Sequence, residues 1–443
     1  MINSRGIAMD TLLAWEKSQE PLDQVLESMV SLAAMDDPRD RQLVMALVYG
    51  VVRWQGYLDA SIQKFSSHPL RQMKPLTLAA LRVGLYQLIF LDRIPESAAI
   101  NETVQALKLA RQPKWLSGFV NGVLRAMARQ RASLPAPDEA AAVLSHPAWL
   151  VARWEELFGQ ERARRICWIN NTSPVLVVRV NTLRISVDDW MSLLRGNGID
   201  CERGLFAQES VRIENFQGSV TALPGYGEGF FVVQDEAAQL VTQLLGPFVS
   251  GRYLDGCAGL GGKALHLAQM VPDGGRVVAV EPSQKRQALL KANVQRLGGP
   301  EIEIHGTTLQ EFAGQPHGGF AGVLVDAPCS GLGVIRRQPD IRWQRSLAAL
   351  QGYQDRQREL LIAAAGLVEK KGVLVYATCS IDPRENDEVI GAFLREHPEF
   401  STTPAQESLP EAAMGLCDGA GFLKTTPEQG LDGFFAARMV RKG

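Results

Sequence analysis

Two cysteines follow apolar stretches of similar composition in the second half of the chain. The stretch "GVLVDAPCSG" places Asp326 three positions before Cys329, and "GVLVYATCSID" leads to Cys379. A thiolate is a strong nucleophile when a substrate carbon must be made reactive, and a neighbouring acid can hold that substrate. The three residues therefore indicate covalent chemistry. The alternatives are buried core cysteines and metal ligands.

The remaining cysteines do not indicate a second site. Neither a C-x-x-C pair nor a histidine cluster accompanies any cysteine, so we expect no metal site. Six cysteines without tight spacing in a chain of 443 residues also do not form a disulfide framework. We predict structural or neutral roles for Cys167, Cys201 and Cys417.

A glycine-rich run, "LDGCAGLGGKALHLAQM", lies between a short apolar strand and an amphipathic helix. It could be only a tight strand-to-helix turn. However, Glu281 ends the next strand, where an acid can accept hydrogen bonds from both ribose hydroxyls of a nucleotide-like cofactor. The run lacks the G-x-G-x-x-G dinucleotide pattern, and its leading acid, Asp255, is typical of S-adenosylmethionine sites.

Strand, loop and helix patterns alternate from about residue 235 to the C-terminus. This alternation predicts an α/β fold with a doubly wound, mostly parallel sheet. Ligands bind beyond the carboxyl ends of the strands in such sheets. The residues predicted at these ends are Asp255, Glu281, Asp326, Cys329 and Cys379.

The front of the chain has a different pattern. Apolar residues recur every three or four positions between Leu43 and Leu58, and about the first 130 residues keep a helical period, which predicts a compact bundle. Residues 146–234 have strand-like and helical segments of a small α/β unit. We predict three domains, at residues 1–140, 146–234 and 235–443.

Composition limits where the protein acts. The charged residues nearly balance, with a formal net charge of −2, so any nucleic-acid site must be a local patch. The N-terminus has no apolar core of a signal peptide, and no apolar run could span a bilayer. We expect a cytoplasmic, monomeric protein that needs neither membrane nor metal.

A basic segment, "GVIRRQPDIRWQR", follows Cys329 and could be that patch. Arginines suit phosphates, and a tryptophan can stack on a base. The predicted RNA contacts are Arg336, Arg337, Arg342 and Trp343. The alternative is a solvated charged loop.

The pairing of D-A-P-C-S with A-T-C-S, behind a C-A-x-x-G-G-K run, resembles the RNA cytosine-C5 methyltransferase family. "INETVQAL" and "SGFVNGVLRAMAR" resemble its NusB-like RNA-binding domain, and "VVRVNTLR" resembles its linking segment. The resemblance implies a Rossmann-like class I S-adenosylmethionine-dependent methyltransferase preceded by an all-α NusB-like bundle. The domain order resembles that of bacterial members that act on 16S ribosomal RNA.

The family's roles imply a function for each matching residue. Cys379 would attack carbon 6 of a cytosine, Cys329 would assist product release, and Asp326 would hold ring nitrogen 3 through a carboxyl that keeps or shares a proton. Glu281 would bind the ribose of S-adenosylmethionine, and Thr307 would stand where the family usually has an acid near the adenine. The cofactor loop would consist of Cys257, Ala258, Gly259, Leu260, Gly261, Gly262 and Lys263.

Departures and rival interpretations remain. Leu260 replaces a usual proline and Ala264 a usual threonine, which puts cofactor affinity in question. Lys263 could reach the active centre or be an exposed lysine at a helix start. A DNA cytosine methyltransferase would use Cys329 as nucleophile and lack Cys379, and an RNA-binding factor with a degenerate catalytic domain would not bind the cofactor. A dehydrogenase does not fit the loop.

Overall fold

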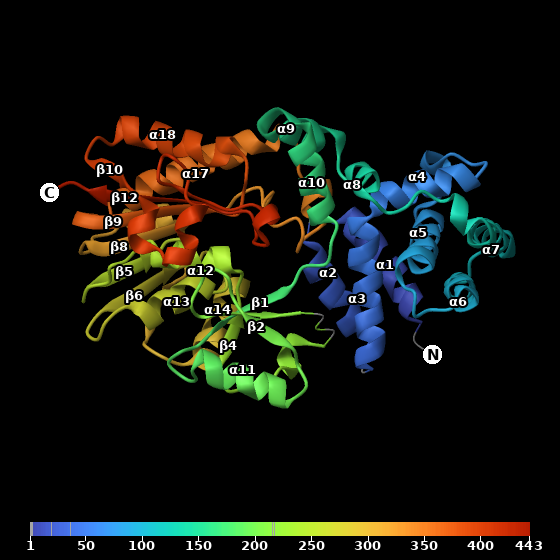
Figure 1. Cartoon of the computed structure of the whole chain (residues 1–443), viewed down its shortest axis with the longest axis horizontal. Helices are drawn as coiled ribbons and strands as arrows, with labels where there is room; N and C mark the ends of the chain where they lie inside the picture. The colour runs from blue at the N-terminus through green and yellow to red at the C-terminus, as the bar shows by residue number, and fades with distance from the viewer. Residues whose placement is uncertain (1–2, 19, 36, 215, 217) are drawn as a thin grey trace. The chain divides into compact units, whose positions relative to one another are not determined.

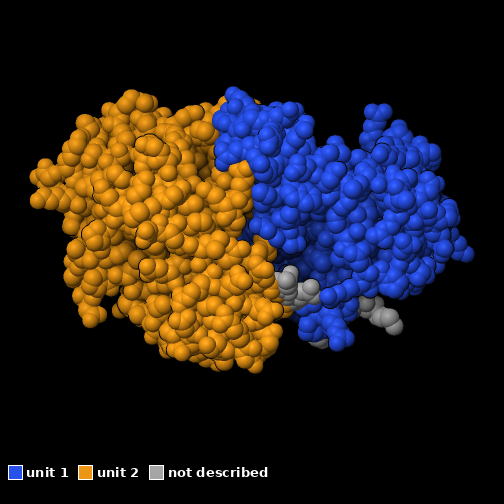
Figure 2. Space-filling model, in the orientation of Figure 1, with its two compact units in different colours: residues 1–173, 335–345 blue, residues 174–334, 346–443 orange. Residues whose placement is uncertain are grey.

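The computed structural model describes residues 3–18, 20–35, 37–214, 216 and 218–443. The chain forms two compact units, coloured separately in Figure 2. Unit 1 consists of residues 1–173 and 335–345, and unit 2 of residues 174–334 and 346–443. These limits differ from the three segments expected from the sequence, so the three-domain division stays a prediction.

Unit 1 is helical, as the period of its sequence predicts (Figure 1). Its central helix is α5, in which Leu81, Leu85 and Leu88 are buried and Pro75 occupies the first turn, where no backbone hydrogen bond is lost. The helices described in unit 1 are α1 (Ser4–Lys17), α2 (Leu22–Leu32), α3 (Pro38–Arg53), α4 (Gln55–Phe65), α5 (Pro75–Phe90), α6 (Glu96–Leu109), α7 (Lys114–Arg129), α8 (Glu139–Leu144), α9 (Ala148–Phe158), α10 (Gln160–Asn170) and α16 (Ile341–Gln344).

The basic segment that follows Cys329 in the sequence belongs to unit 1, and its central arginine is buried there. Arg342 has no exposed surface, and its guanidinium donates to the carbonyl oxygens of Ser145 (3.0 Å) and Asn170 (3.1 Å) and to Oδ1 of Asn171 (2.5 Å). Burial lowers its pKa to about 9, so the side chain is still charged at neutral pH. The predicted RNA contact of Arg342 is therefore wrong, because this charge is used inside the helical unit.

The neighbours of Arg342 in this segment are half-buried. Trp343 donates from its indole to the carbonyl oxygen of Val52 at 2.9 Å, which fixes the ring within unit 1. Arg336 donates to the carbonyl oxygen of Ser173 at 2.8 Å. Base stacking by Trp343 and phosphate contact by Arg336 and Arg337 remain predictions.

Unit 2 begins with a small antiparallel sheet in the order β2-β3-β1-β4. The strands are β1 (Leu176–Val180), β2 (Cys201–Arg203), β3 (Ser210–Ile213) and β4 (Phe231–Val233), and helix α11 (Val187–Gly196) lies between β1 and β2 in the sequence. Trp190 of α11 packs against Phe231 of β4, with ring centroids 4.8 Å apart. This apolar face gives the small sheet a core of its own.

The second sheet of unit 2 has the order β10-β12-β9-β8-β5-β6-β7, with β11 paired to β12. The five strands from β9 to β7 are parallel, and β12 joins β9 antiparallel. The strands are β5 (Arg252–Asp255), β6 (Arg276–Val280), β7 (Ile302–His305), β8 (Phe320–Asp326), β9 (Val368–Thr378), β10 (Phe400–Thr403), β11 (Leu423–Lys424) and β12 (Phe435–Arg441).

Helices cover both faces of this sheet. Along β9, Leu374 and Tyr376 belong to one apolar cluster and Val375 and Ala377 to the other, as alternation along a strand requires. One cluster contains residues of α12 (Glu236–Gln243), α13 (Gly262–Met270) and α14 (Gln284–Leu297). The other contains residues of α15 (Leu309–Ala313), α17 (Ala349–Ala365) and α18 (Asp387–Glu396). The predicted doubly wound, mostly parallel sheet is confirmed.

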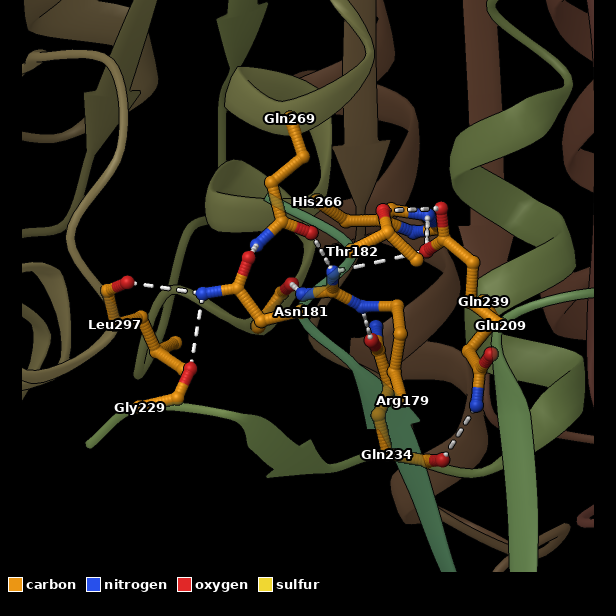
Figure 3. Close-up of polar contacts among 11 residues, drawn as sticks. Arg179, Asn181, Thr182, Glu209, Gly229, Gln234, Gln239, His266, Gln269 and Leu297 are labelled. Atoms are coloured by element: carbon orange, nitrogen blue, oxygen red, sulfur yellow. Dashed lines mark hydrogen bonds and ion pairs between the residues drawn. The ribbon is translucent and has the colours of Figure 1, made fainter. Parts of the chain in front are cut away.

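A buried polar network joins the small sheet to helix α13 (Figure 3). The fully buried Arg179 of β1 donates to Oε1 of Gln234 (2.7 Å), to Gln269 near the end of α13, and to the carbonyl oxygen of Gly262 at its start (3.4 Å). The Gln269 amide donates to Oδ1 of Asn181 at 3.0 Å. Side chains of the small sheet thus hold both ends of the helix that follows the glycine-rich loop.

Candidate active site

The glycine-rich loop connects β5 to α13, and its shape depends on two left-handed residues. Gly261 has φ 87°, and a Cβ there would lie 2.1 Å from Cδ1 of Leu290, so only glycine fits. Gly259 has φ 56°, but a Cβ built on it would meet no atom within 4 Å. The backbone at Gly259 therefore borders open space, as a loop that cradles a ligand requires.

Glu281 follows β6 and is bonded to this loop. Its buried carboxylate accepts hydrogen bonds from the backbone nitrogens of Gly259 (3.1 Å) and Ser283 (2.8 Å). Two backbone donors fix the carboxylate while lone pairs remain for further donors. This geometry fits the predicted ribose acceptor.

Thr307 follows β7, as expected for a group near an adenine. Its hydroxyl donates to Oε2 of Glu311 at 2.6 Å. Because the hydroxyl hydrogen is used there, the oxygen can accept a hydrogen bond from an amino group. Thr307 stays a proposed cofactor residue.

The ends of β8 and β9 bring the two cysteines together. Their sulfur atoms are 3.0 Å apart, and both side chains are partly exposed. The hydrogen bond with Cys379, together with burial, raises the pKa of Cys329 well above its usual value, because Cys329 is the donor in this bond. Cys329 is therefore the protonated partner at neutral pH, and its S–H can donate to the sulfur of Cys379.

The serines that follow the cysteines explain this proximity. Glu385 is fully buried, and its Oε2 accepts from the hydroxyls of Ser330 (2.5 Å) and Ser380 (2.6 Å). Its Oε1 accepts from the Ser330 backbone nitrogen (2.8 Å) and from Nε2 of Gln357 (3.0 Å). One carboxylate thus joins both cysteine-bearing loops.

Sequence reasoning missed Glu385. The signal was available: the same Cys-Ser pair occurs twice, and "DPREN" places an acid six residues after Cys379. Each of two buried hydroxyls at the ends of adjacent strands needs an acceptor, and a nearby acid can serve both. The shared carboxylate therefore ties together the two residues that follow the sulfur-bearing cysteines.

Asp326 and Lys263 form an ion pair beside the cysteines, with 2.5 Å between Nζ and Oδ2. Burial opposes the charge of Lys263, but the charge and hydrogen bond of Asp326 outweigh it and raise the pKa of the amine. Lys263 belongs to the glycine-rich loop by sequence, yet its side chain reaches the end of β8. Of the two predictions for Lys263, the structure supports the one that places it at the active centre.

Asp255, at the end of β5, is a further acid with an altered pKa. It is fully buried, and burial together with the charge of Asp326 raises its pKa to about 7. Burial also raises the pKa of Cys257 above the usual range, so this thiol is protonated and unreactive. The sulfurs that meet at this edge are those of Cys329 and Cys379.

Over the residues that the structure describes, no group of three or more His, Cys, Asp or Glu side chains could hold a metal ion. No helix in the same part of the chain is long and apolar enough to cross a membrane.

Comparisons with known proteins agree with this geometry. The family described as 16S rRNA methyltransferase RsmB/F matches residues 242–440, the NusB family residues 2–129, and the RsmF/B-like ferredoxin-like domain residues 146–220. A probable ribosomal RNA small subunit methyltransferase B of Bacillus subtilis is 35% identical, and the alignment covers 99% of each chain. The chain belongs to the 16S rRNA methyltransferase RsmB/F family.

Further relatives extend this family match. The ribosomal RNA small subunit methyltransferase B of Pseudomonas syringae is 35% identical over 99% of this chain and 97% of its own. The crystal structure of PH0851 has a TM-score of 0.80 and covers 99% of both chains, at 24% identity, which shows a shared fold. The RsmB/F assignment agrees with the resemblance found in the sequence.

S-adenosylmethionine is the cofactor of the RsmB/F family. The residues at the ends of β5 and β6 fit it, because the open backbone at Gly259 can approach a ligand and the carboxylate of Glu281 is fixed beside that loop. Lys263 and the buried Asp255 flank this loop in the sequence. These residues would hold the methyl donor close to Asp326.

Proposed function

We propose that this protein methylates carbon 5 of a cytosine in 16S ribosomal RNA through a covalent bond between the sulfur of Cys379 and carbon 6. The observation that carries the proposal is the 3.0 Å separation of the Cys329 and Cys379 sulfurs beside the Asp326–Lys263 pair. The family names the RNA, and the paired cysteines support the base and the position. The target cytosine must be unpaired or flipped out to reach them.

The nucleophile in this proposal is Cys379. Carbon 5 of cytosine attacks an electrophile only after a nucleophile has added to carbon 6 and made the ring an enamine. Cys329 keeps its proton, since its pKa is raised well above the usual value, and its S–H can stabilise a thiolate on Cys379. The hydrogen bond between the sulfurs is therefore compatible with Cys379 as the attacking group, which is the role that its A-T-C-S motif implies.

Asp326 and Lys263 act on ring nitrogen 3. Addition at carbon 6 places negative charge on the ring, and protonation at nitrogen 3 neutralises it. Asp326 can contact this nitrogen. The ammonium of Lys263 lies 2.5 Å from Oδ2 of Asp326 and holds the proton that the pair shares. The proposed proton thus comes from the ion pair, which refines the expectation of a protonated Asp326.

The cofactor loop and the cysteines complete the reaction. The bound cofactor supplies a sulfonium methyl group. After transfer, the carbon 5 proton leaves to water, the carbon 6–sulfur bond breaks, and its electrons leave with the sulfur of Cys379 as a thiolate while the ring double bond re-forms. The proton on ring nitrogen 3 returns to the Asp326–Lys263 pair. The S–H of Cys329 is placed to donate to this departing sulfur, which supports its proposed role in product release.

Product analysis tests the proposal. The protein is incubated with a 16S ribosomal RNA transcript and methyl-labelled S-adenosylmethionine, and the RNA is digested to nucleosides for mass spectrometry. We expect label in 5-methylcytidine. Label in another nucleoside would refute the assignment of the base or of the position.

The covalent step has its own test. RNA that contains 5-fluorocytidine cannot lose the group at carbon 5, so it should stay bonded to the enzyme. Peptide mapping of this adduct should locate the bond at Cys379. A bond at Cys329 would favour the arrangement expected of DNA cytosine methyltransferases.

A further inference from the structure

Two buried polar residues of the small sheet have no part in the proposed chemistry (Figure 3). Arg179 lies in β1 and Asn181 directly follows that strand, and their exposed fractions are 0% and 1%. Burial lowers the pKa of Arg179 to about 10, so the side chain is still charged at neutral pH. Its ion pair with Glu209 is long, with 4.0 Å between Nη1 and Oε2. Burying a guanidinium costs more than burying an apolar side chain of similar volume, so the role of Arg179 depends on the bonds that it forms.

The bonds of Arg179 lead to helix α13, which begins directly after the glycine-rich loop. The guanidinium donates to the carbonyl oxygen of Gly262, the first residue of this helix (3.4 Å), and to Oε1 of Gln269, its last residue but one. A third bond, to Oε1 of Gln234, is 2.7 Å long. Because a guanidinium is planar and its donors point in fixed directions, these bonds hold α13 at two points.

Asn181 joins the end of α13 to the end of α14. Its Oδ1 accepts from the amide of Gln269 at 3.0 Å. Its Nδ2 donates to the carbonyl oxygen of Leu297, the last residue of α14 (2.9 Å), and to that of Gly229 (2.9 Å). Helix α13 follows the glycine-rich loop, and α14 follows Glu281. One buried amide therefore sets the spacing of the two helices that follow the proposed cofactor residues.

The glycine-rich loop depends on α14 as well as on α13. Nδ2 of Asn293 in α14 donates to the carbonyl oxygen of Leu260 at 3.1 Å. Gly261 lies so close to α14 that a Cβ on it would be 2.1 Å from Cδ1 of Leu290. The side chain of Leu260 is 50% exposed, so the tip of the loop is held by α14 rather than by its own burial. A shift of α14 relative to α13 would therefore change the shape of the loop.

We propose that Arg179 and Asn181 are positioning residues for the methyl donor. They fix helices α13 and α14 relative to each other, and the two helices fix the glycine-rich loop and Glu281 before the ligand binds. A site that is ordered in advance binds more tightly, because less freedom is lost on binding. The inference deepens the proposed function and rests on it only in that the residues after β5 and β6 bind S-adenosylmethionine.

The first test measures cofactor affinity by calorimetry on the full chain without RNA. Arg179→Met keeps the length of the side chain and removes its donors, so S-adenosylmethionine should bind about tenfold more weakly. Arg179→Lys keeps the charge and can bond fewer acceptors at once, so its affinity should recover to within about threefold of the parent. The matched control is Arg203→Met in β2 of the same sheet, where the half-exposed guanidinium donates to Asp188. It should bind within about twofold of the parent, because a surface ion pair contributes little.

The second test uses the residue on α13 that receives both contacts. Gln269 is half-buried and methionine is a good helix former, so Gln269→Met should fold. It removes the bonds to Arg179 and to Asn181 but leaves the bond from Arg179 to Gly262, and cofactor affinity should fall about threefold. In the double variant Arg179→Met, Gln269→Met, the loss should be smaller than the product of the two single losses, because both changes remove the same bond.

Unfolding temperatures and RNA affinity separate positioning from folding. Binding is measured well below the lowest unfolding temperature, and RNA affinity should stay within about twofold of the parent in every variant. Parent-like cofactor affinity in Arg179→Met, with only a lower unfolding temperature, would overturn the proposal, as would equal losses of cofactor and RNA affinity. If Arg179→Met does not fold, Gln269→Met decides, and its parent-like cofactor affinity would overturn the proposal.

These outcomes are distinct from failure of the proposed function. Because no RNA is present in the cofactor titration, failure to form 5-methylcytidine would leave the result unchanged. Weaker cofactor binding in Glu281→Ala together with parent-like binding in Arg179→Met would overturn the positioning role alone. Parent-like binding in both variants would overturn the cofactor site as well.

Discussion

The two halves of the catalytic edge are built differently. At the ends of β8 and β9, side chains bond to one another: the two sulfurs are in contact, and Glu385 holds both serines. At the ends of β5 and β6, the backbone borders open space at Gly259, and a fixed carboxylate lies beside it. Covalent bond formation requires the reacting atoms at fixed positions, whereas cofactor binding requires space for the ligand. Lys263 connects the halves, since it stands in the first turn of α13, directly after the loop that follows β5, and its amine donates to Asp326.

The largest expected effect separates the two cysteines. Cys379→Ala should reduce methylation on the order of 10⁴-fold or more and leave no covalent RNA adduct, because it removes the nucleophile. Cys329→Ala should still form the adduct but release it slowly, because the departing sulfur loses its S–H donor. A denaturing gel after incubation with RNA and S-adenosylmethionine should show a slow protein–RNA band for Cys329→Ala alone.

The double variant is the control, and it should give no band. A band for Cys379→Ala and none for Cys329→Ala would exchange the roles of the two cysteines. Normal turnover in both single variants would mean that the two cysteines only pack in the core. The ends of β8 and β9 would then not be the chemical half of the edge.

The next effect concerns the carboxylate that joins the loops. Glu385→Gln keeps the size of the side chain but replaces an acceptor oxygen with a donor, so either the two serine hydroxyls or the Ser330 backbone nitrogen and the Gln357 amide lose their acceptor. We expect kcat to fall roughly 100-fold, or about 2.7 kcal/mol, with unchanged affinity for S-adenosylmethionine. The exposed Glu388→Gln, three residues later, is the matched control. A lower unfolding temperature with unchanged kcat would make Glu385 a residue of the fold only.

Sequence periodicity predicted the ends of the strands well. Cys329, Cys379, Asp326 and Glu281 follow buried apolar runs, and parallel strands bring such ends to one edge whatever their separation in the chain. What joins them was not predictable in the same way. The bond between Glu385 and Ser330 spans 55 residues and depends on how the loops turn.

Local charge was a poor guide in unit 1. Arg342 lies in a basic segment, yet its acceptors are carbonyl oxygens about 170 and 200 residues earlier, which no local pattern reveals. Whether a charge is used inside or outside the protein is a property of packing.

The cofactor half of the edge should respond in binding. Glu281→Ala removes the proposed ribose acceptor and should weaken S-adenosylmethionine binding by about 2 kcal/mol in calorimetry, with RNA affinity unchanged. The carboxylate also accepts hydrogen bonds from the backbone nitrogens of Gly259 and Ser283. Glu281→Gln is therefore the second variant, because it keeps most of the shape of the side chain. Parent-like affinity in both variants would remove Glu281 from the cofactor site.

The smallest effect tests whether the two halves are electrostatically coupled through Asp255. Its pKa is about 7 in the folded protein because of burial and the charge of Asp326, and about 3.9 when unfolded. The folded state therefore keeps this proton up to a higher pH than the unfolded state does. The resulting stabilisation is fully present below about pH 4 and is lost as the pH rises toward 7. Between pH 5.5 and 7.0 this group alone should lower the free energy of unfolding by about 1.5 kcal/mol.

Urea unfolding at pH 5.5 and 7.0 measures this change. In Asp255→Asn the free energy of unfolding should differ less between the two pH values than in the parent. In Asp326→Asn the loss of stability should occur at a lower pH, because the neighbouring negative charge is gone. An identical pH dependence in the parent and in Asp255→Asn would mean that Asp255 is ionised throughout and that the two halves of the edge titrate independently.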